Sequence, residues 1–363
     1  MRAAARASLY LAVLTAAVAL TGSGATGAGA SPRPHPAPVP PGFFGVVPQA
    51  PLSTSELERM QGTVGTLRLP IYWFEVEAER GVYDFAKTDR AIGDATRLGL
   101  EVLPFVYGTP VWLSRDHARF PLGSKAGRAA WPRFVRALVN RYGPGGEFWR
   151  SRERRRPVRR WQIWNEPNFR LFWRPRPAPR QYAALLASAT AAIRAIDPRA
   201  QIVLAGVAPV GGGLLPWVYL RRLYRLPGVK RDFDAVALHP YGARIGVVAG
   251  QISLARQVMD EAGDSRTPIL VTELGVASRG AIRSAFVKGL RGQAEFLQRS
   301  FALLLDRRRD WGIAGVYWFT WRDWPVPDPH CGFCEGAGLV DLEGRAKPAW
   351  AAYRAVVRAH RPR

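Results

Sequence analysis

Two glutamates follow short apolar runs in this sequence of 363 residues. Glu166 comes directly after Asn165 in the stretch WQIWNEPNF, and Glu273 ends the run PILVTE. Polar groups are costly in a core unless they are hydrogen-bonded, but they are useful at the mouth of a site. Two carboxylates on either side of a gap could hydrolyse a glycosidic bond, with one as proton donor and one at the anomeric carbon. This chemistry requires elements that bring Glu166 and Glu273 together.

Short apolar runs alternate with segments of helical periodicity, such as QYAALLASATAAIRAID. The eight apolar runs span residues 43–48, 66–73, 100–107, 161–164, 202–209, 233–239, 268–272 and 315–319. This alternation indicates parallel βα units, and eight of them predict an α/β fold, a (β/α)8 TIM barrel. An open, doubly wound sheet shows the same alternation and is the alternative. The lack of a Gly-rich dinucleotide motif after the first run weakens that alternative.

The barrel would bring the two glutamates together. In this fold the carboxyl ends of all strands open into one mouth, where catalytic side chains lie. Glu166 would end the fourth strand and Glu273 the seventh. These two strands face one another across a barrel, so the two carboxylates are expected to converge.

Several strand ends resemble those of the clan A retaining glycoside hydrolases. IWNEPN and TELG resemble the fourth and seventh strand ends of that clan, which carry the acid/base and the nucleophile. LRLPIYW, ERGVYDFAKTD, HPY and YWFTW resemble further parts of the clan's barrel, in the same order. The resemblance is nearest to the family 39-like and family 5-like single-domain enzymes and covers residues 43–363. It implies that Glu166 is the acid/base and Glu273 the nucleophile.

The resemblance also implies roles for polar neighbours. Asn165 would contact the sugar 2-hydroxyl, and Tyr241 would orient the nucleophile. Arg68 is expected to pair with Glu273, because a nearby cation keeps a carboxylate ionised. His239 would line the same subsite, although a single histidine at a strand end can equally be a hydrogen-bonded structural residue.

Some of the 13 Trp residues could stack on sugar rings. Those at or just beyond predicted strand ends are the candidate platforms, namely Trp73, Trp318, Trp321 and Trp324. Trp112, in GTPVW after the third run, is either a platform or a packing residue.

The N-terminal sequence predicts export. Arg2 and Arg6 precede an apolar run from about Ala7 to Leu20, and the small residues Ala28-Gly29-Ala30 offer a cleavage site. Together these features predict a secretory signal peptide over residues 1–30. The proline-rich stretch 31–42 predicts a linker, and residues 43–363 predict the catalytic domain. No later run of 18 uncharged apolar residues occurs, so a membrane anchor is not expected.

The formal net charge is +24. Its densest cluster, RSRERRRPVRR at residues 150–160, precedes the fourth predicted strand and would lie on the face opposite the mouth. The cluster is either a solvated loop or a weak contact for a polyanion, which would be sensitive to salt. Aromatic residues do not alternate with these arginines, so nucleic acid is not an expected partner.

Cys331 and Cys334, in HCGFC, are the only cysteines. In an exported protein such a pair predicts a disulfide rather than a redox motif, and it would brace the loop after the eighth strand. With five His and no paired His spacing, neither a metal nor a cofactor is expected. The expected partner is a carbohydrate substrate, and the protein is expected to be a monomer. A non-catalytic glycan- or polyanion-binding protein on the same barrel is the alternative function.

Overall fold

The computed structural model describes residues 39–209, 211–280, 284–325 and 331–360. The predicted signal peptide and residues 31–38 of the predicted linker lie outside the described residues. In the described part of the chain, no helix has the length and apolar character needed to cross a membrane.

Eight parallel strands form a barrel, and each overlaps one of the eight predicted apolar runs. The strands are β1 (Phe44–Val47), β2 (Thr66–Tyr72), β3 (Glu101–Tyr107), β4 (Arg160–Ile163), β5 (Gln201–Val203), β6 (Val236–Leu238), β7 (Ile269–Leu274) and β8 (Ile313–Phe319). Their order is β5-β4-β3-β2-β1-β8-β7-β6. Isolated parallel bridges, Val203 to Ala235 and Val207 to Leu238, link the two ends of this order. The (β/α)8 prediction is confirmed, and the doubly wound alternative is wrong.

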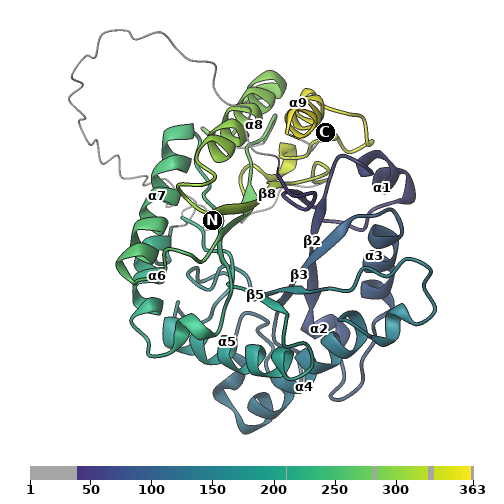
Figure 1. Cartoon of the computed structure of the whole chain (residues 1–363), viewed down its shortest axis with the longest axis vertical. Coiled ribbons are helices and arrows are strands. Elements are labelled where there is room, and N and C mark those ends of the chain that lie inside the picture. The colour runs from purple at the N-terminus through teal and green to yellow at the C-terminus, as the bar shows by residue number, and fades with distance from the viewer. Residues whose placement is uncertain (1–38, 210, 281–283, 326–330, 361–363) are drawn as a thin grey trace, which may run out of the picture. The chain divides into compact units, whose positions relative to one another are not determined.

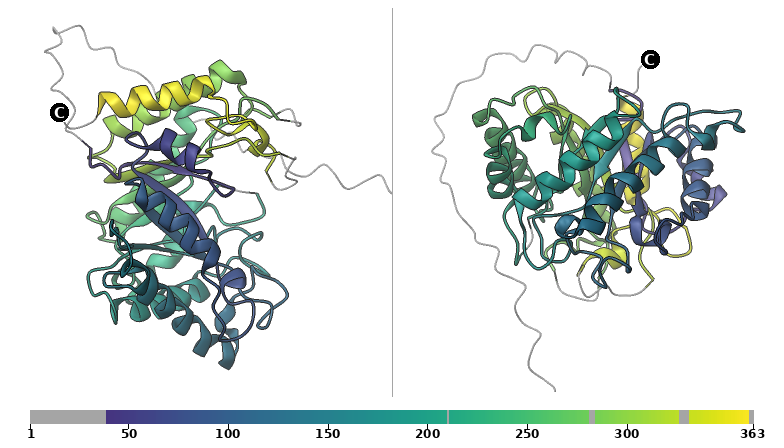
Figure 2. Two further views of the ribbon diagram at one scale, coloured as in Figure 1. Left: turned by 90° about the vertical axis from the view of Figure 1, so that its right-hand side faces the viewer. Right: turned by 90° about the horizontal axis from the view of Figure 1, so that it is seen from below.

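Helices surround the strands (Figure 1). They are α1 (Thr54–Met60), α2 (Trp73–Val76), α3 (Ala86–Arg97), α4 (Lys125–Tyr142), α5 (Pro179–Arg194), α6 (Pro216–Tyr224), α7 (Ile245–Glu261), α8 (Gly289–Asp306) and α9 (Pro348–Ala359). Local sequence fixes several helix starts: Ser53 forms a capping box with Glu56, Ser124 caps α4, and a proline stands in the first turn of α5, α6 and α9. The C-terminal helix α9 packs beside α8 (Figure 2).

Side chains alternate between two apolar layers, as a strand's period of two requires. On β8, Val316 and Trp318 belong to the layer between strands and helices. Tyr317 and Phe319 point the other way, into the smaller cluster inside the barrel. The direction of each residue at a strand end therefore depends on the register of that strand.

Candidate active site

Glu166 and Glu273 converge in the structure as predicted. Glu166 lies just after β4 and Glu273 lies in β7, and they are 7% and 8% exposed. An oxygen of one carboxylate lies within 4.8 Å of an oxygen of the other. Two carboxylate charges this close in a buried site repel, which favours the neutral form of one of the two groups.

The chain turns sharply at the end of β4 to present these polar groups. Trp164 and Glu166 have φ of 74° and 39°, in the left-handed region that residues with a side chain rarely adopt. Such conformations persist where surrounding contacts hold them, often at functional sites. Here the Glu166 amide donates to the Gly206 carbonyl at 3.0 Å. The Asn168 amide group bonds with the backbone of Ala208 and Leu214, which ties this turn to the loop after β5.

A different irregularity positions Glu273. The pairing of β7 with β8 shifts register between Val271 and Leu274. In a regular strand, adjacent residues point to opposite faces, whereas a bulge re-aims them. As a result both Thr272 and Glu273 contact site residues, namely His239 and Arg68.

Arg68, from β2, connects the polar residues of the site. Its fully buried guanidinium donates to Glu273 Oε1 at 2.6 Å and to Asn165 Oδ1 at 2.8 Å. Its Nε donates to Gln162 Oε1 at 2.6 Å. The predicted ion pair of Arg68 with Glu273 is confirmed. The Tyr241 hydroxyl donates to the other oxygen, Glu273 Oε2, at 2.7 Å, so both oxygens of this carboxylate accept hydrogen bonds.

His239 lies against both carboxylates. Its Nδ1 is 2.7 Å from Glu166 Oε1 and 3.6 Å from Glu273 Oε2, and its Nε2 is 3.0 Å from Thr272 Oγ1. Burial lowers the pKa of His239 well below its usual range, and the Arg68 charge lowers it further, so the ring is neutral. A close approach of Gly206 leaves room for the imidazole, because a Cβ there would lie 2.0 Å from Nε2.

Burial raises the pKa of Glu166 well above its usual range. The negative charge of Glu273 raises this pKa further, and Arg68 opposes both effects. Burial also raises the pKa of Tyr241, as does its bonded neighbour Glu273, so the phenol stays protonated. Glu166 is therefore suited to donate a proton, while Glu273 is held by donors that favour an anion.

Glu166, His239 and Glu273 are also the group of side chains whose ligand atoms could hold a metal ion. The environment argues against this use, because the Arg68 cation and the Tyr241 hydroxyl already bond to the two oxygens of Glu273. A cation would also lie close to the Arg68 charge. The donor set fits a pair of carboxylates in acid–base work better than a metal centre.

Three predicted platforms require correction. Trp73, Trp318 and Trp321 are at most 1% exposed, so their ring faces cannot stack on a sugar. Trp73 stacks on Phe134 of α4. Trp318 points outward to Phe301 of α8, because strand alternation directs it away from the barrel interior. Trp321 packs against Trp350 of α9.

The other two tryptophans are less buried. Trp112 is half-buried, and its indole donates to the Glu77 carbonyl at 2.9 Å, while its ring lies edge-on to Trp73. The role of Trp112 as a platform for a sugar ring stays a prediction. Trp324 packs against the inner cluster that also contacts Tyr241.

Two aromatic residues that the sequence motifs did not single out lie beside Tyr241. The Phe319 ring lies edge-on to Tyr241 at 6.1 Å, and the Phe333 ring lies 5.5 Å from it. Phe319 could have been found from strand alternation, since it is the neighbour of the outward-facing Trp318. Phe333 carried no such signal, because it lies in an irregular loop. These rings, rather than Trp318, supply apolar surface next to Tyr241, whose hydroxyl bonds to Glu273.

Phe333 belongs to the disulfide loop, which we define as residues 331–338. The predicted disulfide between Cys331 and Cys334 is present. Phe333 also stacks on Phe286, from the segment after β7, with ring centroids 5.1 Å apart. The loop thus connects the ends of β7 and β8 at the side of the site.

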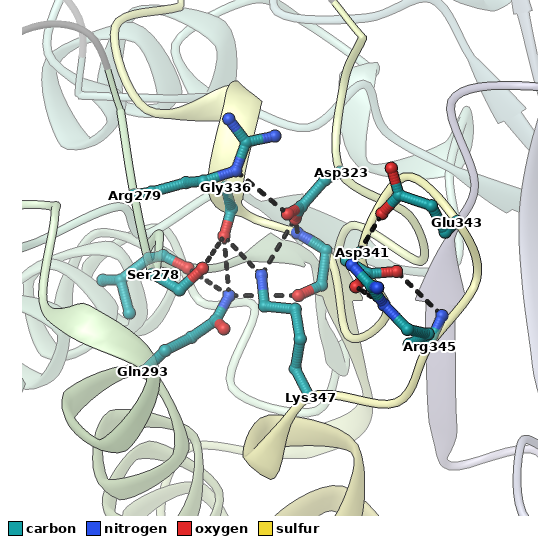
Figure 3. Close-up of polar contacts among 11 residues, drawn as sticks. Ser278, Arg279, Gln293, Asp323, Gly336, Asp341, Glu343, Arg345 and Lys347 are labelled. Atoms are coloured by element: carbon teal, nitrogen blue, oxygen red, sulfur yellow. Dashed lines mark hydrogen bonds and ion pairs between the residues drawn. The ribbon is translucent and has the colours of Figure 1, made fainter.

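A buried polar network holds the base of the disulfide loop (Figure 3). The Lys347 ammonium donates to Asp323 Oδ1 and to the Gly336 carbonyl, both at 2.9 Å. Gln293, from α8, also donates to the Gly336 carbonyl, and the Gly338 amide donates to Asp323. Lys347 and Asp323 are almost completely buried and form an ion pair, and the partly exposed Arg279 lies 3.5 Å from the other oxygen of Asp323.

Comparison with solved structures finds this fold in glycoside hydrolases. A family 39 glycoside hydrolase from the gut symbiont Bacteroides cellulosilyticus WH2 is 19% identical with a TM-score of 0.65, over 87% of this chain and 63% of that one. A GH39 β-xylosidase from Caulobacter crescentus is 22% identical with a TM-score of 0.64, over 89% and 72%. For a GH5_18 protein from Bifidobacterium longum subsp. infantis the values are 16%, 0.66, 88% and 79%.

The chain has the barrel fold of these enzymes. It spans less than two thirds of the Bacteroides cellulosilyticus enzyme's length. No protein-family model matches the sequence, and no curated protein matches it. At these sequence identities the similarity to the solved structures establishes the fold alone.

Proposed function

We propose that this protein is a retaining β-glycoside hydrolase that cleaves an oligo- or polysaccharide. The observation that carries the proposal is the pair of carboxylate oxygens within 4.8 Å of one another. Retaining enzymes place the two carboxyl groups about 5 to 5.5 Å apart, whereas inverting enzymes separate them by about 6.5 to 9.5 Å to admit a water. The 4.8 Å limit applies to one oxygen of each carboxylate; it is closer to the retaining spacing than to the inverting one, and it supports direct attack by one carboxylate on the sugar.

In the first step, protonated Glu166 gives its proton to the glycosidic oxygen as the bond from that oxygen to the anomeric carbon breaks. An oxygen of Glu273 forms a bond to the anomeric carbon, which yields a glycosyl ester. The hydrogen bonds of Arg68 and Tyr241 hold the Glu273 carboxylate in place for this attack. Positioning of this kind lowers the entropic cost of bringing the reacting atoms together.

In the second step, Glu166 removes a proton from a water whose oxygen attacks the anomeric carbon and releases Glu273. The negative charge of Glu273 is one cause of the raised pKa of Glu166, and formation of the ester removes this charge. The pKa of Glu166 therefore falls after the first step. The same side chain then serves as an acid first and a base second.

Asn165 supplies substrate contact in this proposal. Its Oδ1 accepts from Arg68, and its Nδ2 has no hydrogen-bond partner among the described residues. Nδ2 is therefore left to donate to the sugar hydroxyl next to the anomeric carbon, a bond that strengthens in the transition state. Phe319 and Phe333 would give that sugar an apolar wall.

The panel of first substrates follows from proteins of the same fold. Solved proteins with this fold include β-xylosidases and an exo-β-1,4-mannosidase. Aryl β-xylosides, β-mannosides and β-glucosides therefore form the initial panel. The sequence of residues 1–30 supports the further proposal that the protein acts outside the cell.

The decisive experiment follows the product anomer by NMR at the first measurable time. Net retention is expected for the unmodified enzyme, and an inverted product would overturn the mechanism. Glu166→Gln and Glu273→Gln should each abolish turnover of a poor leaving group. Glu295→Gln, an exposed change on α8, is the matched control and should leave it unchanged. Binding of glycans without turnover of any panel member would instead favour a non-catalytic protein.

A further inference from the structure

The basic segment at residues 150–160 plays no part in the proposed catalytic chemistry. Two of its seven arginines pair with acids: Arg159 lies 3.7 Å from Asp197, and Arg160 lies 2.8 Å from Glu101. For the other five, no carboxylate among the described residues lies within 4.0 Å. These five, all exposed, are Arg150, Arg152, Arg154, Arg155 and Arg156. We call them the basic surface.

The basic surface lies at the opposite end of the barrel from the active site. It directly precedes Arg160, the first residue of β4, whereas Glu166 follows the last residue of that strand. Arg154 donates to the carbonyl of Arg97 at 3.5 Å, at the end of α3 and just before β3 begins. Contacts to the starts of two neighbouring strands fix the position of this segment on the barrel.

A hollow of about 90 Å³ opens within the basic surface. It is lined by Gly145, Gly146, Trp149, Arg150, Arg155 and Pro157. Arg150 and Arg155, which line it, have no acid partner in the described part of the chain, and a guanidinium presents the planar donor fork that matches a carboxylate or a sulfate. The remaining three arginines continue the positive charge beyond the hollow. This arrangement fits a chain with repeated anionic groups better than a single small anion.

The chemistry of the surroundings narrows the class of partner. Single-stranded nucleic acid is recognised by stacking bases on exposed aromatic rings. Here Phe148 and Trp149 are only 6% and 3% exposed, and Arg152 covers the Phe148 ring at 4.4 Å. Membrane surfaces are bound by basic residues together with exposed large apolar side chains. Among the described residues, the exposed large apolar side chains all lie outside this segment.

We propose that the basic surface binds an anionic polysaccharide, one that carries carboxylate or sulfate groups. Binding at this end leaves the mouth of the barrel free, so a bound protein could still cleave a chain at its active site. The contact is electrostatic, and its affinity therefore falls as salt rises.

The test measures binding of polygalacturonate to the full chain by titration calorimetry at several salt concentrations. The triple variant Arg154→Gln, Arg155→Gln, Arg156→Gln should bind at least about tenfold more weakly at low salt. A matched control, Arg299→Gln, Arg354→Gln, Arg358→Gln, removes the same charge from exposed positions on α8 and α9. At about 0.1 M salt, where the Debye length is about 10 Å, this control should change the affinity less than about threefold, since more distant charges are largely screened.

Several results would overturn the proposal or replace the proposed partner. Equal losses in the two triple variants would show that net charge alone causes binding, and would overturn the proposal. Undetectable polygalacturonate binding at low salt would do the same. Tighter binding of an oligothymidylate, or of vesicles with anionic lipid, than of polygalacturonate would replace the proposed partner by nucleic acid or membrane. Hydrolysis of a small neutral substrate should be unchanged in both triple variants, which separates this proposal from the catalytic one.

Discussion

The Nδ1 atom of His239 lies 2.7 Å from Oε1 of Glu166, and the imidazole has no exposed surface. Because the pKa of His239 is lowered, the ring is neutral and adds no positive charge beside the glutamate. A protonated ring would stabilise the Glu166 anion and promote loss of its proton. The neutral ring instead leaves Glu166 able to hold the proton that it must donate.

The pH dependence of kcat/KM should be bell-shaped on a phenyl glycoside. Glu166 must be protonated in the free enzyme, so activity is lost as pH rises through its pKa. Since that pKa is raised, the upper limb should lie at a higher pH than the ordinary value of 4.5. Initial rates across the pH range, fitted to two ionisations, measure it. Glu166→Gln can be followed on a dinitrophenyl glycoside, whose leaving group needs no proton, and an upper limb that persists in this variant would belong to another group.

Azide should distinguish the two glutamates. Glu166→Ala removes leaving-group protonation, a loss on the order of 10²- to 10⁴-fold, yet a dinitrophenyl glycoside should still form the ester. Azide then replaces water and gives a glycosyl azide of retained configuration. Glu273→Ala should give the inverted azide, because azide occupies the place of the missing nucleophile. NMR of the two products checks both assignments, and exchanged outcomes would exchange the roles.

Tyr241→Phe should lower kcat by about 10- to 100-fold. It removes the hydroxyl that donates to Glu273 Oε2 at 2.7 Å, and a hydrogen bond to a charged group contributes about 1.5 to 3 kcal/mol. Tyr224→Phe is the matched control, because it removes a phenol at the end of α6 that donates at the same distance to Asp264, which lies just after α7 and away from the mouth. Steady-state kinetics should show no change in kcat for this control. A similar loss in both variants would indicate a general effect on folding.

Gly206→Ala should lower both the melting temperature and the activity. The new Cβ would lie 2.0 Å from His239 Nε2, so the imidazole must move and its bond to Glu166 is lost. Gly246→Ala, on α7, has no neighbour within 4 Å of its new Cβ. Alanine stabilises a helix relative to glycine by about 1 kcal/mol, so this control should melt slightly higher. Thermal unfolding and kinetics of both variants test the contrast.

Lys347→Met should reduce the free energy of unfolding by up to about 3 to 5 kcal/mol, because it removes the closest cation of the buried Asp323 and leaves only Arg279, 3.5 Å away. Lys87→Met breaks an exposed pair with Glu75 and should cost less than about 1 kcal/mol. Urea unfolding measures both. Replacing Asp323 with Asn in the Lys347→Met background should recover part of the loss. A cost as small as that of the Lys87 variant would show that the network contributes little.

Much of the fold is encoded locally. The eight apolar runs and the helical segments between them follow from side-chain periodicity, which depends only on neighbouring residues. Alternating strands and helices leave few compact topologies, since parallel strands need crossover connections and these are right-handed. For the same reason the positions of Glu166 and Glu273 at two strand ends could be predicted. The cysteine spacing in HCGFC likewise predicted the disulfide that is present.

The tertiary structure decided which side chains face the site. Trp318 and Phe319 are adjacent, and only the register of β8 determines that Phe319 points inward while Trp318 packs on α8. Glu166 and Glu273 lie close to one another because β4 is followed by residues with left-handed backbone conformation and because the pairing of β7 with β8 shifts register. Phe333 reaches Tyr241 through a loop held by the buried Lys347. Register, bulges and loop paths depend on contacts between residues far apart in the chain, so local periodicity does not contain them.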